Sequence, residues 1–91
     1  MEPDSVPYLP RGVRMHFDKV RDIWVLLAPE RALKLDQIGL AILGEVDGAR
    51  PLSEIAETLS AKYNAPLEQI TTDSAAFLTS LADRRMLEVR P

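Results

Sequence analysis

The sequence predicts an α+β fold, in which a small three-stranded antiparallel sheet is followed by a three-helix bundle. Residues 13–35 carry apolar residues in alternation or in short runs, as strands do, and residues 36–83 carry them at helical spacing. Strands and helices are segregated along the chain rather than alternating, which is typical of the α+β class. The length of 91 residues fits a single domain.

The composition excludes several classes of function. The chain has no cysteine, which rules out a disulfide framework, a thiolate metal site and a thiol nucleophile. No apolar run approaches the roughly 20 residues that span a bilayer, and the first residues lack the basic-then-apolar order of a signal peptide, so we expect a cytoplasmic protein. The net charge is −3, and residues 36–91 hold nine acidic but only five basic side chains, which argues against a nucleic-acid partner.

Residues 1–12 are expected to form a Pro-rich N-terminal arm. Pro3, Pro7 and Pro10 each fix their own φ and lack a main-chain donor, so the segment is extended rather than helical. Such an arm is either disordered or reaches across to a second subunit. Residues 13–91 then form the single folded domain.

The first strand is predicted over residues 13–17. Val13, Met15 and Phe17 share one face, whereas Arg14 and His16 share the other. This two-residue period is typical of a half-buried strand.

The second strand, residues 22–28, is apolar on both faces, as expected of a central strand. Its Trp24 and Leu26 are either covered by the arm or a helix, or form an apolar patch that meets a partner. A Pro29-Glu30 turn leads to the third strand, Arg31–Leu35, which is short and lies at an edge. There Leu33 and Leu35 point inward, and the two residues that point outward are Ala32 and Lys34.

The first helix is expected to begin after Asp36, whose carboxylate can cap it, and to stop at Asp47-Gly48. Gly39 and Gly44 weaken this helix but would allow another backbone to approach closely. Its apolar stripe comprises Ile38, Ala41, Ile42 and Val46.

The second helix is predicted to start at a Ser53 cap and to reach Tyr63. The segment Asn64-Ala65-Pro66 separates it from a third helix that ends near Asp83. The apolar stripe of the third helix comprises Ile70, Ser74, Phe77, Leu78 and Leu81. Short connections, three helices and a small antiparallel sheet together indicate a winged-helix-like arrangement with its hairpin at the N-terminal end.

No catalytic or metal-binding constellation is evident. The single histidine, His16, lies on the polar face of a strand without cysteine or clustered carboxylates near it in the sequence. The four glycines are scattered, so there is no phosphate-binding loop. We therefore expect no enzymatic activity, no metal and no cofactor.

Two other classes of function stay open at this level. Winged-helix folds often bind DNA, but the third helix carries Glu68, Asp73 and Asp83 and no lysine or arginine, which disfavours a DNA groove. A purely structural dimer could use the Pro-rich arm and Trp24.

An ordered series of short motifs resembles the PqqD family of pyrroloquinoline quinone (PQQ) biosynthesis. The first part of the series comprises Val25-Leu26-Leu27-Ala28-Pro29-Glu30, Leu35, Ile42-Leu43 and Asp47-Gly48. The second part comprises Glu54-Ile55, Leu59, Tyr63, Asp73 and Phe77-Leu78. The resemblance extends from Arg11 to Leu87. Asp36 stands where members often have Asn, and Arg85-Met86 stands where many have Gly and an aromatic residue, both at helix caps.

The resemblance implies a non-catalytic peptide chaperone. Proteins of this family bind a ribosomally made precursor peptide, here PqqA-like, and present it to a radical-SAM enzyme, here PqqE-like, that cross-links its Glu and Tyr side chains. Similar domains act as recognition elements for ribosomally synthesized and post-translationally modified peptides (RiPPs). In these domains the peptide typically adds a strand to the sheet, which agrees with the edge strand expected from the residues.

The peptide is therefore expected to pair with the edge strand and to lie against the third helix. The strand supplies Arg31, Ala32, Leu33, Lys34 and Leu35. On the helix, Asp73, Phe77 and Leu81 recur every four residues and share one stripe. Phe77 and Leu81 would receive apolar peptide side chains, unless they are wholly core, and Asp73 would pair with a basic one.

Overall fold

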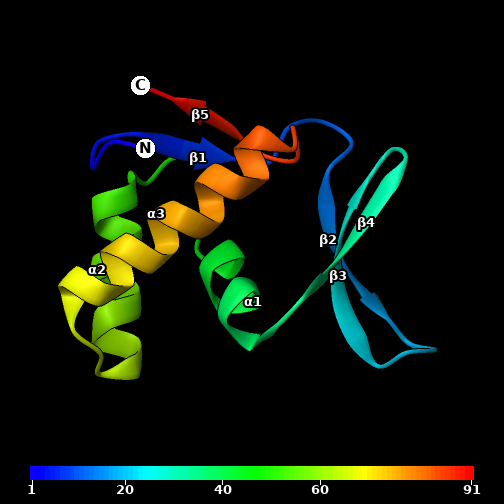
Figure 1. Cartoon of the computed structure of the whole chain (residues 1–91), viewed down its shortest axis with the longest axis horizontal. Helices are drawn as coiled ribbons and strands as arrows, with labels where there is room; N and C mark the ends of the chain where they lie inside the picture. The colour runs from blue at the N-terminus through cyan, green and yellow to red at the C-terminus, as the bar shows by residue number, and fades with distance from the viewer.

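The structure, a computed structural model, describes all residues 1–91 and confirms the predicted α+β fold. Strands β2, β3 and β4 form an antiparallel sheet in that order, and β1 and β5 form a separate antiparallel pair (Figure 1). The three-stranded sheet projects to one side of the helices, as a wing does. The strands are β1 (Val6–Tyr8), β2 (Arg14–Asp18), β3 (Ile23–Ala28), β4 (Arg31–Leu35) and β5 (Glu88–Arg90). The helices are α1 (Gln37–Gly44), α2 (Leu52–Tyr63) and α3 (Leu67–Asp83).

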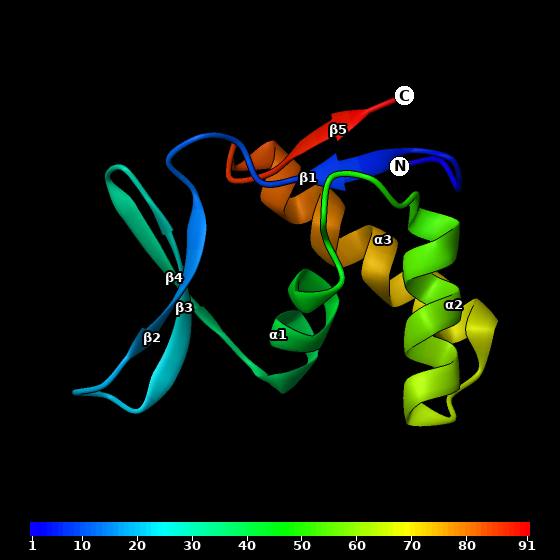
Figure 2. The ribbon, with the colours of Figure 1, turned by 180° about the vertical axis from the view of Figure 1, so that it is seen from behind.

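The N-terminal segment is extended, as its prolines require, and it is paired within its own chain. Strand β1 lies beside β5, so the two ends of the chain run together over the helices (Figure 2). The main-chain N–H of Leu52 donates to the Ser5 carbonyl at 2.8 Å, and that of Ser53 donates to the Pro3 carbonyl at 2.9 Å. The segment thus satisfies donors at the start of α2 that a helix leaves without intrahelical partners.

This pairing corrects the predicted cap of the second helix. The helix begins at Leu52 with Pro51 as its N-cap residue, and no side chain caps it. Ser53 cannot be the cap because it lies inside the first helical turn, where its own N–H donates to the Pro3 carbonyl and the Ile55 N–H donates to the Pro51 carbonyl.

The inner face of the sheet follows the predicted alternation. Leu26 lies between Met15 and Leu33 in the register, and Trp24 contacts Phe17 with ring centroids 5.4 Å apart. Leu26 is fully buried in the main core, so it cannot form part of an exposed patch. Only Trp24 of that pair, 38% exposed, is available to a partner.

Helix α1 begins as predicted and ends earlier. Asp36 is its N-cap, and the Asp36 Oδ1 atom accepts a hydrogen bond from the Gly39 N–H at 2.7 Å. The last helical residue is Gly44, so Val46 lies outside the helix, and Gly48 occupies a separate turn with φ +77°.

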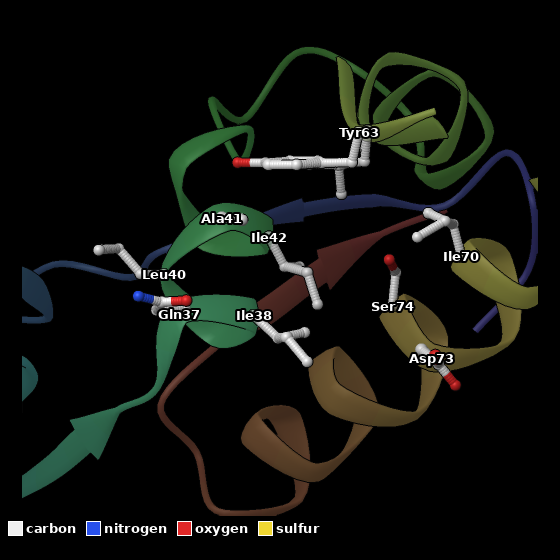
Figure 3. A pocket seen from close by; sticks show the side chains of 10 residues that line it. Gln37, Ile38, Leu40, Ala41, Ile42, Tyr63, Ile70, Asp73 and Ser74 are labelled. Carbon is white, nitrogen blue, oxygen red and sulfur yellow. The ribbon is translucent and has the colours of Figure 1, made fainter. Parts of the chain in front are cut away.

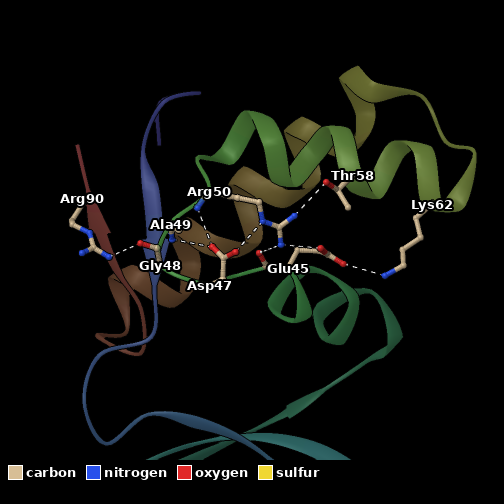
Figure 4. A network of polar contacts seen from close by, with 8 residues as sticks. All are labelled: Glu45, Asp47, Gly48, Ala49, Arg50, Thr58, Lys62 and Arg90. Carbon is tan, nitrogen blue, oxygen red and sulfur yellow. Dashed lines mark hydrogen bonds and ion pairs between the residues drawn. The ribbon is translucent and has the colours of Figure 1, made fainter.

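The early end of α1 is explained by a polar network around Arg50 (Figure 4). The Arg50 guanidinium donates to the Glu45 carbonyl at 2.8 Å, to the Glu45 and Asp47 carboxylates and to the Thr58 hydroxyl. Lys62 forms a second ion pair with Glu45 at 3.1 Å. The network occupies carbonyl and carboxylate groups just after α1 and ties that segment to α2, which favours a turn over a further helical turn.

The same network perturbs two carboxyl groups. Main-chain N–H donors of Arg50 and Ala49, at 2.9 Å, together with the Arg50 guanidinium, lower the pKa of Asp47 to about 2. Hydrogen bonds from Arg50 and Lys62 hold the pKa of Glu45 below its ordinary value. Because the folded-state pKa is depressed, the stabilisation from each carboxylate is complete above its unfolded-state pKa and is lost as pH falls toward the folded-state value.

We therefore expect Asp47→Asn to make the free energy of unfolding less dependent on pH between pH 4 and pH 2. Asparagine retains an oxygen for the main-chain donors and removes only the charge. Urea denaturation at a series of pH values measures this slope, with Glu57→Gln on the exposed face of α2 as the control. An Asp47→Asn slope equal to that of the wild type would show that the turn carboxylate contributes nothing to acid sensitivity.

Helix α3 ends in a Schellman motif that has arginine where glycine is favoured. The Met86 N–H donates to the Leu81 carbonyl and the Arg85 N–H donates to the Ala82 carbonyl, both at 3.0 Å. Arg85 has φ +61°, in the left-handed region. Met86 is buried beside Leu81 in the core, which compensates for the strained residue between them.

Arg85→Gly is expected to raise the stability by about 0.5–1 kcal/mol, since glycine adopts a positive φ without steric cost. Thermal denaturation measures the gain, and Arg84→Gly, at a neighbouring residue with φ −88°, is the matched control that should destabilise. A lower melting temperature for Arg85→Gly would mean that interactions of the arginine side chain stabilise the fold by more than its left-handed backbone conformation destabilises it.

Candidate functional site

A groove of about 400 Å³ lies between strand β4 and the C-terminal half of helix α3. Its apolar lining consists of Leu33 and Leu35 from the strand and Phe77 and Leu81 from the helix. Leu81 is buried and belongs to the core, so it forms the base of the groove. Phe77 is only half-buried, so part of its ring is accessible from the groove. The polar lining residues are Lys34, Asp36, Ser80 and Arg84.

Strand β4 has a free main-chain edge on the side away from β3. It follows a two-residue turn and is paired with β3 alone, with Arg31 opposite Ala28. In an antiparallel ladder alternate residues hydrogen-bond to the partner strand, and the residues that flank a two-residue turn do so. The N–H and C=O groups of Ala32 and Lys34 therefore point away from β3, where another strand can pair with them.

Basic groups gather where β4 approaches the end of α3. Lys34 and Arg84 line the groove, and the guanidinium of Arg31 donates a hydrogen bond to the Arg84 carbonyl at the C-cap of the helix. A cation is favourable at this end of a helix because of the partial negative charge there. The opposing Asp36 carboxylate is engaged as the α1 cap. The basic lining of the groove thus favours acidic ligand groups.

Gly39 sets the position of Phe77. A Cβ atom at Gly39 would lie 3.0 Å from the ring of Phe77 and 3.2 Å from the Asp36 carboxylate. The sequence predicted that Gly39 and Gly44 admit another backbone, but Gly39 admits an aromatic side chain and Gly44 has no atom within 4 Å of such a Cβ. Gly39 thereby lets the Phe77 ring rest on α1.

A second cavity, of about 550 Å³, lies between helices α1, α2 and α3 (Figure 3). Its lining is mostly apolar, with Asp73 at the α3 side and Gln37 at the α1 side. Asp73 is exposed and accepts a hydrogen bond from the Gln69 amide at 2.9 Å.

The structure brings five of the eight predicted site residues to the groove: Leu33, Lys34, Leu35, Phe77 and Leu81. Arg31 and Ala32 are exposed on the same strand without lining the groove. Asp73 lines the neighbouring cavity instead, because it lies one turn nearer the N-terminus of α3 than Phe77, beside Ile70 and Ser74.

Sequence reasoning did not assign a binding role to Asp36, Ser80 or Arg84. Ser80 and Arg84 follow Phe77 at spacings of three and seven, which places them on its face of the helix, and this helical spacing was the signal that could have identified them.

No group of three or more His, Cys, Asp or Glu side chains is arranged to hold a metal ion. No helix of the chain has the length and apolar character needed to cross a membrane. The features that remain are an open strand edge and two clefts along α3.

Comparison with known families gives a match over residues 24–87 to the family described as Coenzyme PQQ synthesis protein D (PqqD). The chain belongs to the PqqD family. Relatives named PqqA binding protein include one from Rhizobium meliloti (strain 1021), 49% identical over 93% of this chain and 87% of that protein. Another, from Xanthomonas campestris pv. campestris (strain 8004), is 44% identical over 94% of each chain.

A solved structure of a PqqD family member shows the same fold. The solution structure of the PqqD part of Methylobacterium extorquens PqqCD, described as a functional stand-alone RiPP recognition element, is 45% identical and covers 97% of this chain and 99% of that chain, with a TM-score of 0.77. The names of these PqqD relatives describe binding and recognition rather than catalysis, which confirms the prediction that the chain is not an enzyme.

Two glycine substitutions in α1 test how tightly Phe77 is held in this PqqD chain. Gly44→Ala is expected to stabilise by about 0.5 kcal/mol, because helix propensity improves and space is free. Gly39→Ala gains the same propensity but crowds the Phe77 ring, so it should be at least about 1 kcal/mol less stable than Gly44→Ala. Chemical denaturation compares the two variants, and equal stabilities would mean that Phe77 shifts freely into the groove.

Proposed function

We propose that this protein binds a PqqA-like precursor peptide by adding it as a strand to β4, and that it presents the bound peptide to a PqqE-like radical-SAM enzyme without catalysing a reaction itself. The observation that carries the proposal is the free edge of β4 beside an apolar groove, in a chain whose relatives are named PqqA binding protein. Because the precursor is made on ribosomes, the complex is expected to form in the cytoplasm.

Strand addition accounts for both affinity and specificity in this groove. The peptide main chain would bond to the outward groups of Ala32 and Lys34, which gives affinity independent of sequence. Side chains alternate along an added strand, so every second peptide residue would point toward Phe77 and Leu81 and the others toward solvent. Lys34 and Arg84, which line the groove, would favour acidic peptide residues.

A peptide held in this way suits presentation to an enzyme. Strand pairing engages only a short segment, because β4 has five residues. Peptide residues beyond that segment, including those to be cross-linked, stay accessible to a catalytic site on another protein. Asp73, one cavity further along α3, would pair with a basic residue of such a flanking segment.

Two other hypotheses are less well supported. Helix α3 has the acidic composition expected from the sequence, with no basic residue between Leu67 and Asp83, which disfavours specific binding to duplex DNA. Self-association would now depend on Trp24, since Leu26 is buried and β1 pairs with β5 of the same chain. Light scattering over a range of concentrations tests the homodimer.

We expect Lys34→Pro to weaken binding of synthetic PqqA at least tenfold, since proline removes an outward N–H that the peptide would accept from. Lys34→Ala is the matched control, because it removes the charge and keeps the donor, and its loss should be much smaller. Isothermal titration measures both affinities, and melting curves verify that Lys34→Pro is folded. An affinity for folded Lys34→Pro equal to that of Lys34→Ala would exclude pairing along β4.

A further inference from the structure

The cavity between α1, α2 and α3 is larger and more apolar than the groove beside β4. Seven of its ten lining residues are apolar, among them Ile38, Ala41, Leu59 and Ile70, and its volume is about 550 Å³. Two large side chains at its rim are exposed: Ile38 to 67% and Tyr63 to 59%. Figure 3 shows the Tyr63 ring across one side of the cavity and Ile38 on the opposite side. Exposed apolar groups around a cleft of this size are typical of a binding site.

A hydroxyl without a partner faces this cavity. Ser74 is only 1% exposed, and its oxygen points into the space between Ile42 and Ile70 (Figure 3). The side-chain hydrogen bonds of α3 are made by Gln69, Asp73 and Thr71, and none involves Ser74. Every fully enclosed side-chain polar atom of the chain has a partner, so the small exposed area of Ser74 lies at its hydroxyl. The hydroxyl therefore opens onto the cavity without a protein partner, which leaves it available to hydrogen-bond to a ligand there.

The cavity continues the path of a peptide along β4. Asp36 and Phe77 line the groove, and the next residues of α1, Gln37 and Ile38, line the cavity. Phe77, whose ring lies beside Gly39 of α1, lines the groove and not the cavity. Along α3 the distance from Leu81 to Asp73 is about 12 Å, which an extended chain covers in roughly four residues.

We propose that this cavity is a second subsite for the same precursor peptide, and that it takes a large apolar side chain roughly four residues from the segment paired with β4, on the side of α1. The Ser74 hydroxyl donates a hydrogen bond to an acceptor atom of that peptide residue, and Ile38 and Tyr63 cover the apolar part of the peptide side chain. The proposal rests on the proposed function and adds a second anchor to it. Two anchors on either side of Phe77 fix the register of the peptide, which main-chain pairing alone leaves free to slip.

The test is titration of the full chain with synthetic PqqA after filling the cavity. Ser74→Leu places a bulky side chain where the peptide residue would lie, so the affinity should fall at least tenfold. Its melting temperature should not fall, because leucine fills an apolar space. Thr72→Leu, the same kind of change on the exposed opposite face of α3, is the matched control and should bind as the wild type does.

Each result has a distinct meaning. If the wild type does not bind PqqA, the proposed function fails, and the subsite with it. If the wild type binds and Ser74→Leu binds equally well, the cavity is not a peptide subsite, and the groove along β4 is unaffected. A change in molar mass in light scattering without a change in PqqA affinity would instead assign the cavity to a second copy of the chain. Should Ser74→Leu not fold, Ile38→Ser at the exposed rim of the cavity is tested in its place. Its affinity for PqqA should be severalfold weaker than that of the wild type. An unchanged affinity would contradict the subsite.

Discussion

The spacing between helix α3 and the sheet is the constraint on which the groove depends. Leu78 and Leu81 of the helix and Leu26 of β3 are fully or almost fully buried in one core, so they hold the helix against the sheet. Close packing of such side chains permits little sliding. The edge strand β4 is therefore kept beside a rigid helix, and the space left between them is a groove rather than a packed interface.

The two ends of the chain stabilise the packing of the helices by pairing with each other and with the start of α2. Strand β5 follows the Schellman turn of α3 and pairs with β1, whose preceding residues accept hydrogen bonds from the start of α2. The Arg50 network fixes the segment between α1 and α2. Of the strands, β4 is the one whose residues line the groove, and its outer edge is not paired with another strand.

Local patterns were sufficient to predict the elements that form the groove. The bounds of β4, the Asp36 cap and the inward Leu33 and Leu35 follow from alternation and capping, which act over a few residues. Long-range contacts could not be predicted in this way. The carbonyl of Pro3 accepts a hydrogen bond from the Ser53 N–H at the start of α2, and the neighbours of Asp73 depend on how α1 packs on α3.

The central claim is that a peptide completes the sheet at β4, and amide hydrogen exchange with and without PqqA tests it most directly. Two amides, those of Ala32 and Lys34, point away from β3 and should exchange readily in the free protein. On saturation with PqqA, both should become protected, while the amides of Leu33 and Leu35, already bonded to β3, change much less. Binding of PqqA that leaves Ala32 and Lys34 unprotected would contradict strand addition and place the peptide elsewhere on the domain.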